Sequence, residues 1–437
     1  MHRTRRSEDP WGSGRFGPGA GHTARAAPSE HRAAHGRDPA FPGDSVAARR
    51  VDRDVSGAVR EVLEELLRGR VQDAAALDAT FAAEVAARVA DFTLNGGKRL
   101  RAQFLWWALR ACNGGSRPAT VNSALRLAAG LELIQTCALV HDDVMDGSPV
   151  RRGGPALHVV LGAGRTLPGA SDAGVSFGSA AAVLAGDLAL CWADDVVADA
   201  WDAYPVGAEA RTRVRALWQA MRTEMVAGQY LDLHGQVSGS RTVGGAIRIA
   251  TLKSALYSVE RPLALGAALA GADLRTSAAL CSAGRCAGIA FQLRDDLLGA
   301  FGDPLDTGKP SGEDIRDGKP TYLTAIARAR AQASGDRTAT ALLDASLGDA
   351  TLSDDGLDRV RGVLEDTGAR NVVEAKISRL VAVAHRHLAS VPLVPGAQER
   401  LRELMAGLAA APGAGAGRTA SGPRRTAFHE EETRWAR

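Results

Sequence analysis

The sequence predicts an all-α protein that folds as a single large antiparallel helical bundle around a central cavity. In the middle of the chain, apolar residues recur at spacings of three and four, as on the buried face of a helix. No segment shows a convincing alternation of apolar and polar residues, so no strand is predicted. Hydrophobic residues make up 45% of the 437 residues but aromatic ones only 5%. This composition suits closely packed, alanine-rich helices.

The helical pattern is interrupted wherever glycine and proline gather, because these residues end helices. Such clusters lie at residues 114–118, 147–155, 162–178 and 302–320. Between them the spacing predicts helices over residues 55–67, 81–92, 100–109, 123–140, 179–200, 208–233, 244–269, 276–299, 321–331, 353–367 and 369–388.

The two ends of the chain differ from the middle. Residues 1–45 are rich in Gly, Pro, Ser and Arg and lack apolar periodicity, and residues 412–437 are similar. Segments of this composition cannot bury enough apolar surface to fold. We therefore expect two disordered tails around one folded domain over residues 46–411.

Charge, hydropathy and cysteine usage exclude several classes of protein. Lys plus Arg is 53 and Asp plus Glu is 50, a balance that argues against a dedicated nucleic-acid binder. The longest apolar runs, at residues 125–140 and 180–193, are interrupted by Arg126, Glu132 and Asp187, so no transmembrane segment is predicted. The five cysteines include no CxxC pair, which indicates buried free thiols in a reducing cytoplasm and argues against a zinc site.

An acidic motif follows the apolar stretch at 123–140. Asp142, Asp143 and Asp146 stand within five residues, and Asp142 and Asp146, four apart, face the same side of a helix. Like charges at this spacing repel, so the helix end calls for cations. Oxygen-only ligands of this kind suit Mg²⁺, which is typically held by one or two carboxylates and by substrate phosphates. A solvated acidic helix end is the alternative.

A second acidic pair, Asp295 and Asp296, ends the apolar stretch at 276–299. Helical bundles commonly build metal sites from side chains on facing helices. Two acidic helix ends that face each other would therefore line a cation-binding cavity, and the repetition of the motif makes coincidence improbable.

Basic residues gather in two glycine-containing segments. Lys98, Arg99 and Arg101 follow the glycine pair at 96–97, and Arg151 and Arg152 precede another glycine pair. Glycine lets the backbone approach a ligand closely, and Lys and Arg side chains bind anions. Lys253, Lys309 and Lys319 add further positive charge downstream. The combined pattern predicts a ligand that carries phosphates and Mg²⁺ and has an apolar remainder, because the surrounding helices are apolar.

From about residue 55 to residue 391 the sequence resembles the trans-isoprenyl diphosphate synthases of the polyprenyl synthetase family, most of all a bacterial geranylgeranyl diphosphate synthase. The resemblance rests on motifs that occur in the family's order: GGKRLR, DDVMD, RRGG, GD, EMVAGQYLD, LKSA, FQLRDDLLGAFGD, TGKPSGED and DGKPT. It implies an isoprenoid synthase type of helical bundle around an active-site cavity, with residues 46–411 as the catalytic domain.

The resemblance also implies roles for single residues. Asp142, Asp146 and Asp295 match the Mg²⁺ ligands, with Asp143 and Asp296 beside them as catalytic residues. The residues that match diphosphate-binding positions divide between two substrates. Those implied for isopentenyl diphosphate are Lys98, Arg101, Gln135 and Arg152, and those implied for the allylic diphosphate are Arg151, Lys253, Ser254, Gln292, Lys309 and Lys319. Gln229 and Asp232 match polar cavity residues, for which a structural role is equally expected.

One motif departs from the family pattern. The second acidic motif reads DDLLG, because Gly299 stands where a final aspartate would complete DDxxD. Asp303 lies a turn further on. We expect metal binding to survive on Asp295.

The implied reaction is Mg²⁺-dependent, head-to-tail condensation of isopentenyl diphosphate with an allylic diphosphate, with three Mg²⁺ ions expected. The residues one turn before Asp142, namely Cys137 and Ala138, are small and are expected to form the floor of the tail pocket. One helical turn is ~5.4 Å, on the order of one isoprene unit, so small residues here favour a long product such as geranylgeranyl diphosphate (C20). Longer polyprenyl diphosphates and farnesyl diphosphate are the alternatives, and Trp106, Trp107 and Trp192 are alternative floor residues, with core packing expected for them.

Two other classes of protein fit less well. A class I terpene cyclase would need Ser or Thr at Gly299 and Glu at Asp303 in its second metal motif. A non-catalytic synthase subunit would have lost the aspartates that this chain retains. The family resemblance further implies a cytoplasmic homodimer.

Overall fold

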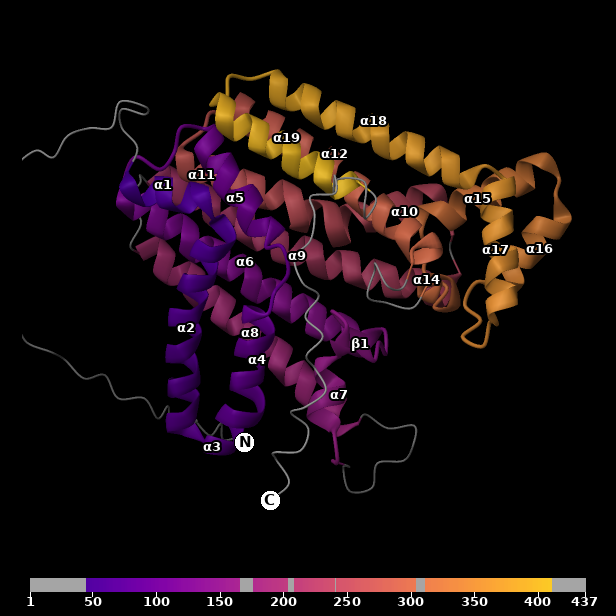
Figure 1. The fold of residues 1–437 in the computed structure, drawn as a ribbon, viewed down its shortest axis with the longest axis horizontal. Coiled ribbons are helices and arrows are strands. Elements are labelled where there is room, and N and C mark those ends of the chain that lie inside the picture. The colour runs from indigo at the N-terminus through magenta and orange to yellow at the C-terminus, as the bar shows by residue number, and fades with distance from the viewer. Residues whose placement is uncertain (1–44, 166–175, 203–207, 240, 304–310, 411–437) are drawn as a thin grey trace, which may run out of the picture. The chain divides into compact units, whose positions relative to one another are not determined.

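The computed structural model describes residues 45–165, 176–202, 208–239, 241–303 and 311–410 (Figure 1). All of these belong to one compact unit that begins at Gly43. The two predicted tails lie outside the described residues apart from Ser45, and so does Lys309. The predictions about them therefore remain predictions.

The described chain is almost entirely helical. Its elements in order are α1 (Val46–Arg53), α2 (Val55–Leu77), α3 (Ala79–Phe81), the π-helix η1 (Ala82–Ala86), α4 (Ala87–Leu94), α5 (Leu100–Ala111), α6 (Pro118–Met145), β1 (Val150–Arg151), β2 (Gly154–Pro155), α7 (Leu157–Gly162), α8 (Phe177–Asp202), α9 (Ala208–Ser238), α10 (Val243–Ile249), the π-helix η2 (Ala250–Glu260), α11 (Arg261–Ala270), α12 (Leu274–Phe301), α14 (Glu313–Arg316), α15 (Tyr322–Ser334), α16 (Arg337–Ser346), α17 (Asp354–Asp366), α18 (Ala369–Ala389) and α19 (Pro395–Ala409).

The all-α prediction is confirmed, and each predicted segment is helical to within a residue of its predicted bounds. The helices α2, α6 and α9 extend five to ten residues beyond those bounds, and the segments 81–92 and 244–269 include the π-helices η1 and η2. Two differences concern short elements. β1 and β2 form an antiparallel pair of two residues each, too short to show a periodic pattern. The helices α1, α7, α14, α16 and α19 were not predicted. Asp336 caps α16 and Pro395 opens α19, and both are typical start signals.

The longest apolar helix, α6, lies in the centre of the largest core cluster. Leu127, Leu131 and Ile134 of α6 are fully buried, and α6 packs along α8. Gly130 permits this close approach, because a β-carbon there would lie 2.5 Å from Val197. By length and composition α6 could cross a membrane, but 72% of its apolar window is buried inside the fold, as expected for a core helix.

The helix η2 is held between α9 and α12 by two glycines. A β-carbon at Gly228 of α9 would lie 2.3 Å from the backbone nitrogen of Lys253, and one at Gly288 of α12 would lie 2.5 Å from Ala255 Cα. The backbone of η2 is therefore in direct contact with both neighbours. This packing fixes the position from which Lys253 and Ser254 extend.

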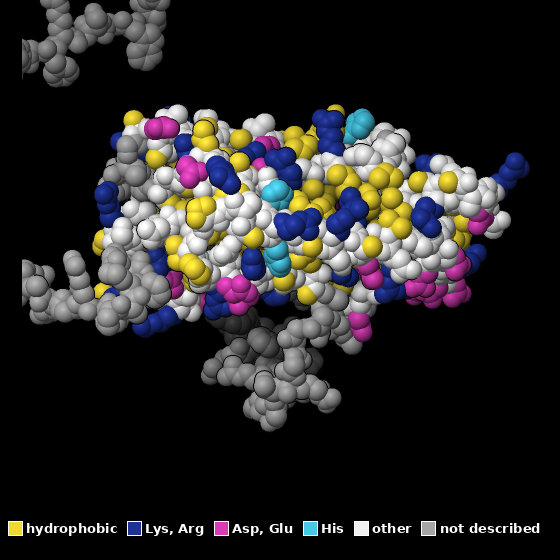
Figure 2. Space-filling view, turned by 90° about the horizontal axis from the view of Figure 1, so that it is seen from above, with side chains coloured by type: hydrophobic (Ala, Val, Ile, Leu, Met, Phe, Trp, Pro, Cys, Tyr) yellow, Lys and Arg dark blue, Asp and Glu magenta, His cyan; other side chains and the backbone are white. Residues whose placement is uncertain are grey.

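The five cysteines differ in their burial. All five cysteines are free, but only Cys137 is buried and Cys191 is exposed, so the prediction that all are buried was wrong. On the face shown in Figure 2, basic and hydrophobic side chains are interspersed, and acidic ones are scattered, with their largest group at the right end.

Candidate active site

One cavity of about 1650 Å³ contains most of the predicted site residues. It is lined by side chains from α5, α6, β1, α8, α9, α10, η2 and α12 and from residues 313–314 and 319–321. Asp142 at the end of α6 and Asp295 and Asp296 near the end of α12 all line it. The prediction that two acidic helix ends share one cavity is therefore consistent with the fold.

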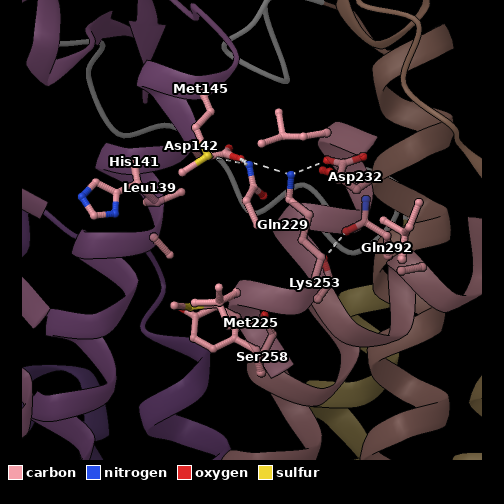
Figure 3. A pocket seen from close by; sticks show the side chains of 18 of the residues that line it. Leu139, His141, Asp142, Met145, Met225, Gln229, Asp232, Lys253, Ser258 and Gln292 are labelled. Carbon is pink, nitrogen blue, oxygen red and sulfur yellow. Dashed lines mark hydrogen bonds and ion pairs between the residues drawn. The ribbon is translucent and has the colours of Figure 1, made fainter. Parts of the chain in front are cut away.

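Asp142 is surrounded by donors from three other elements, of which Figure 3 shows Gln229 of α9 and Lys253 of η2. Its Oδ1 accepts hydrogen bonds from Lys253 Nζ and from Gln229 Nε2, both at 3.1 Å, and its Oδ2 lies 3.3 Å from an Arg151 guanidinium nitrogen. Burial alone would raise the pKa of Asp142, but the charges of Lys253 and Arg151 outweigh it and lower the pKa. Asp142 is therefore held as a carboxylate.

Lys253 and Asp232 extend this network on the opposite side. Lys253 Nζ lies 2.6 Å from Asp232 Oδ2 as well as near Asp142. Burial alone would lower the pKa of Lys253, yet the two carboxylates raise it. Lys253 is thus a cation at ordinary pH, and Gln229 and Asp232 contact the site directly.

Asp143 does not line the cavity. It is fully buried beneath the motif and forms an ion pair with Arg151, whose Nε lies 2.7 Å from Asp143 Oδ1. Arg151 does line the cavity. In this arrangement Asp143 anchors the arginine, whereas Asp142 faces the cavity.

Asp146 is covered by Lys319. Its side chain is 3% exposed, and its Oδ2 lies 3.0 Å from Lys319 Nζ. The other oxygen, Oδ1, is buried and has no hydrogen-bond partner among the described atoms. An orphaned, buried carboxylate oxygen at this place suits a cation ligand.

The second motif carries a different charge state. Asp296 is buried and accepts a hydrogen bond of 2.9 Å from Gln292 Nε2, and Ser254 donates to Gln292 Oε1. Burial, assisted by the charges of Asp314 and Asp295, raises the pKa of Asp296 to about 8. Asp295 beside it is the more exposed of the pair and faces the cavity.

The space beside Gly299 is occupied by another carboxylate. A β-carbon at Gly299 would lie 2.5 Å from Asp314 Oδ2, and Asp314 Oδ1 lies 3.4 Å from Lys319 Nζ. Asp314 therefore lies where the motif lacks its final aspartate, whereas Asp303 does not line the cavity. The sequence analysis did not assign a role to Asp314, although it belongs to the quoted segment TGKPSGED.

The predicted isopentenyl diphosphate residues form a basic group at the end of α4 and the start of α5. Arg152 donates to the carbonyl oxygens of Phe92 and Asn95, at 3.0 and 3.1 Å, which brings it to the loop that contains Lys98. Lys98 itself is exposed. Of the four predicted residues, only Arg101 and Gln135 line the cavity.

Tyr257 and Ser258 of η2, to which the sequence analysis assigned no role, orient Arg101 and Gln135 in the cavity wall. Arg101 lies over the ring of Tyr257 at 4.2 Å and donates to Ser258 Oγ at 2.8 Å. The Tyr257 hydroxyl donates to Gln135 Oε1. π-Helical segments frequently occur at functional sites, but no periodicity in the sequence distinguishes them from α-helix.

Cys137 and Ala138 both line the cavity one turn before Asp142, as their predicted role requires. Trp106, Trp107 and Trp192 do not line it, and Trp106 and Trp192 are buried in the core. The expectation of core packing for these two tryptophans is met.

The donor set fits Mg²⁺ that is completed by a ligand. Among the described residues, no group of three or more His, Cys, Asp or Glu side chains could hold a metal ion without further ligands. Asp142 and Asp295 instead offer separated carboxylates in the cavity wall, and Asp146 lies buried beneath Lys319, which also lines the cavity. This fits Mg²⁺, which uses one or two carboxylates per ion together with substrate phosphates.

Comparisons with known proteins agree with this geometry. The family model described as polyprenyl synthetase matches residues 83–353. The geranylfarnesyl diphosphate synthase of Aeropyrum pernix is 32% identical over 310 residues, which cover 71% of this chain and 88% of the relative. The geranylgeranyl diphosphate synthase of Mycobacterium tuberculosis is 32% identical over 282 residues, 64% of this chain and 71% of the relative.

The fold is also shared with a solved structure. The geranylgeranyl pyrophosphate synthase from Corynebacterium glutamicum, complexed with isoprenyl diphosphate and magnesium, is 37% identical, with a TM-score of 0.73 over 80% of this chain and 97% of that chain. Fold, motif order and family match thus coincide. The chain belongs to the polyprenyl synthetase family of prenyltransferases.

Proposed function

We propose that the protein condenses isopentenyl diphosphate with an allylic diphosphate head to tail and that its main product is geranylgeranyl diphosphate. The observation that carries this proposal is the pair of acidic motifs on α6 and α12, which line one cavity with an adjoining basic group and apolar walls. A substrate with a diphosphate head and an apolar tail matches both parts of the cavity.

The allylic diphosphate is proposed to lie between the two acidic motifs. Three Mg²⁺ ions, held by Asp142, Asp146 and Asp295 together with the diphosphate, would act as Lewis acids on the charge that builds up on the leaving group. Arg151, Lys253 and Lys319 line the same part of the cavity and would add positive charge beside the oxygens of the diphosphate. Gln292, which is hydrogen-bonded to Ser254 and Asp296, is held in a fixed orientation in the cavity wall beside these cations.

Isopentenyl diphosphate is proposed to bind at the basic group of Lys98, Arg101 and Arg152, with Gln135. Tyr257 and Ser258 fix Arg101 and Gln135, so these groups are preorganised. Because both substrates are held in one site, their reaction becomes effectively unimolecular, and this supplies much of the rate acceleration. The apolar walls exclude water, which would otherwise quench the allylic cation. The proton lost at the end is taken up by the released diphosphate.

Product length is the finer part of the proposal. Cys137 and Ala138 leave the tail pocket open one turn below Asp142, which favours a tail longer than that of farnesyl diphosphate. The relatives are named for farnesyl, geranylgeranyl and geranylfarnesyl products, so farnesyl diphosphate and longer polyprenyl diphosphates are the competing outcomes.

A cytoplasmic homodimer is also proposed. Large hydrophobic side chains outside the cavity are exposed on α8: Leu184 is 64% exposed and Val183 43%. A second copy of the chain would cover such a face. Light scattering on the purified protein checks the dimer, and a mass equal to one chain at micromolar concentration would contradict it.

Product analysis tests the proposed function. Purified protein is incubated with Mg²⁺, isopentenyl diphosphate and, separately, dimethylallyl, geranyl and farnesyl diphosphates, and the dephosphorylated products are separated by chromatography and mass. A main C20 alcohol is the expected result. Products of another length would refute the chain-length part alone, and no elongation of any starter would refute the synthase.

A further inference from the structure

The tail portion of the cavity can be followed along three helices. At its upper end Asp142 of α6 bonds to Gln229 of α9. Lower down, the α-carbon region of Gly130 on α6 lies against Trp218 of α9, since a β-carbon there would be 3.5 Å from the indole. α6 and α9 therefore run in the same direction along the cavity, from residues 130 and 218 to residues 142 and 229.

The helix α8 runs antiparallel to them. His141 of α6 lies 3.0 Å from the carbonyl oxygen of Val183, whereas Gly130 lies against Val197. Asp194 of α8 is therefore at the level of Gly130 and Trp218, at the lower end of the tail region. Trp218 Nε1 donates to Asp194 Oδ1 at 2.8 Å, which confirms this level directly.

Along α9, one stripe of side chains faces this region. Gln229, Met225, Arg222 and Trp218 follow at spacings of four, three and four, which places them on the same helix face. The first three line the cavity, and Trp218 is buried with 1% exposure. The first charged group below the diphosphate level in this stripe is Arg222, seven residues or ~10 Å below Gln229.

Arg222 is fixed in place by Asp194. Its guanidinium NH1 forms an ion pair with Asp194 Oδ2, and it lies 5.9 Å from the Trp218 ring. The pair is not fully buried, with side-chain exposures of 30% for Arg222 and 42% for Asp194. Its charged groups therefore keep part of their hydration, and an apolar chain end that pressed against them would have to remove that water at a cost in free energy.

We propose that Arg222, held by Asp194, is the specificity-determining residue that ends product growth, a polar floor two helical turns below Gln229. This inference rests on the proposed synthase function and refines its product length. Cys137 and Ala138 let the growing tail pass the first turn, and the hydrated Arg222–Asp194 pair then stops it. Trp218 lies about one turn beyond Arg222, so removal of the charge admits one more isoprene unit and no more.

The test compares variants that separate charge from size. Arg222→Met keeps a long side chain without the charge, and Arg222→Lys keeps the charge. Arg213→Met is the matched control, because Arg213 is on the same helix and also 30% exposed but does not line the cavity. Products are sized with farnesyl diphosphate as starter, and circular dichroism verifies folding. Arg222→Leu replaces Arg222→Met if the latter does not fold.

The expected result is a main product one isoprene unit longer for Arg222→Met, with wild-type product length for Arg222→Lys and Arg213→Met. An unchanged product for Arg222→Met, or equal lengthening by Arg222→Lys, would overturn the polar floor while the wild-type enzyme still elongates. A wild-type protein that elongates no starter would instead refute the proposed function itself.

Discussion

The two acidic motifs differ in how their charge is balanced. At the end of α6, Asp142 and Asp146 each lie within ion-pair distance of a lysine or arginine, and the pKa of Asp142 is lowered. On α12, the neighbours of Asp296 are Gln292 and other carboxyl groups, and its pKa is raised to about 8. Asp142 is thus ionised before a ligand arrives. At the second, Asp296 holds a proton below about pH 8.

The two acidic motifs therefore differ in how far they are preorganised for a ligand. The cations around Asp142 hold the first motif in one geometry, so it is preorganised. Asp296 of the second motif is instead held by a neutral partner, Gln292. The variants below test this division, from the largest expected effect to the smallest.

Asp142→Asn should have the largest effect on catalysis. The substitution removes a charge that Lys253, Gln229 and Arg151 all contact, and we expect kcat to fall by ~10²–10³-fold, as for loss of a central electrostatic group. Steady-state kinetics with saturating Mg²⁺ measure it. A loss of less than about tenfold would show that the first motif is not the dominant metal site.

Arg151→Met should have the largest effect on stability. It removes the guanidinium that neutralises the fully buried Asp143, and breaking a buried ion pair from one side costs ~3–5 kcal/mol. Urea unfolding measures this loss. Arg152→Met, in the neighbouring position of the same loop, is the control and should cost far less, because Arg152 is exposed. Equal costs for the two variants would contradict the anchoring role of Asp143.

Ala138→Phe should change the product without abolishing activity. A phenyl ring one turn below Asp142 would fill the passage between the two ends of the cavity, so we expect a product shorter by one or more isoprene units. Ala138→Ser is the control and should keep the wild-type product. Product sizing that finds the same length for Phe as for Ala would show that the growing tail does not pass Ala138.

Asp296→Asn should change the pH dependence of stability. Between its ordinary pKa of 3.8 and about 8, folded Asp296 keeps a proton that the unfolded chain has lost, so its contribution to stability decreases as pH rises through this window. Without Mg²⁺, the variant should gain stability relative to wild type between about pH 5 and about pH 8.

Thermal unfolding in the presence of a chelator measures this gain. The exposed Asp366→Asn is the control and should show no such trend. A difference between Asp296→Asn and wild type that stays constant with pH would contradict a protonated Asp296.

The sequence predicted which residues form this site better than it predicted how those residues contact one another. Asp142 and Asp295 were recognisable because an acidic group ends an apolar helix, which is a local pattern. The position of Asp314 beside Gly299 was not recognisable, because it depends on how residues 311–320 return to α12. The π-helical turn at η2 likewise depends on close contacts of Gly228 and Gly288 with neighbouring helices. Tertiary contacts, and not periodicity, determine both.

The role of Asp143 likewise depends on tertiary contacts that the sequence does not reveal. Spacing places Asp142 and Asp146 on one helix face and Asp143 on another, but only the fold shows that this other face is buried against Arg151. The three carboxylates of the motif thus differ: Asp142 lines the cavity, Asp146 is buried against Lys319 and Asp143 is buried against Arg151.

The central claim is that the two motifs act together on one diphosphate. Calorimetric titration of an unreactive allylic thiodiphosphate, with Mg²⁺ and with chelator, tests it on wild type, Asp142→Asn, Asp295→Asn and the double variant. We predict that each single substitution abolishes the Mg²⁺-dependent part of the affinity nearly as completely as both together, the non-additivity of coupled groups. Losses that simply add, or tight binding in chelator, would contradict a shared metal and diphosphate site.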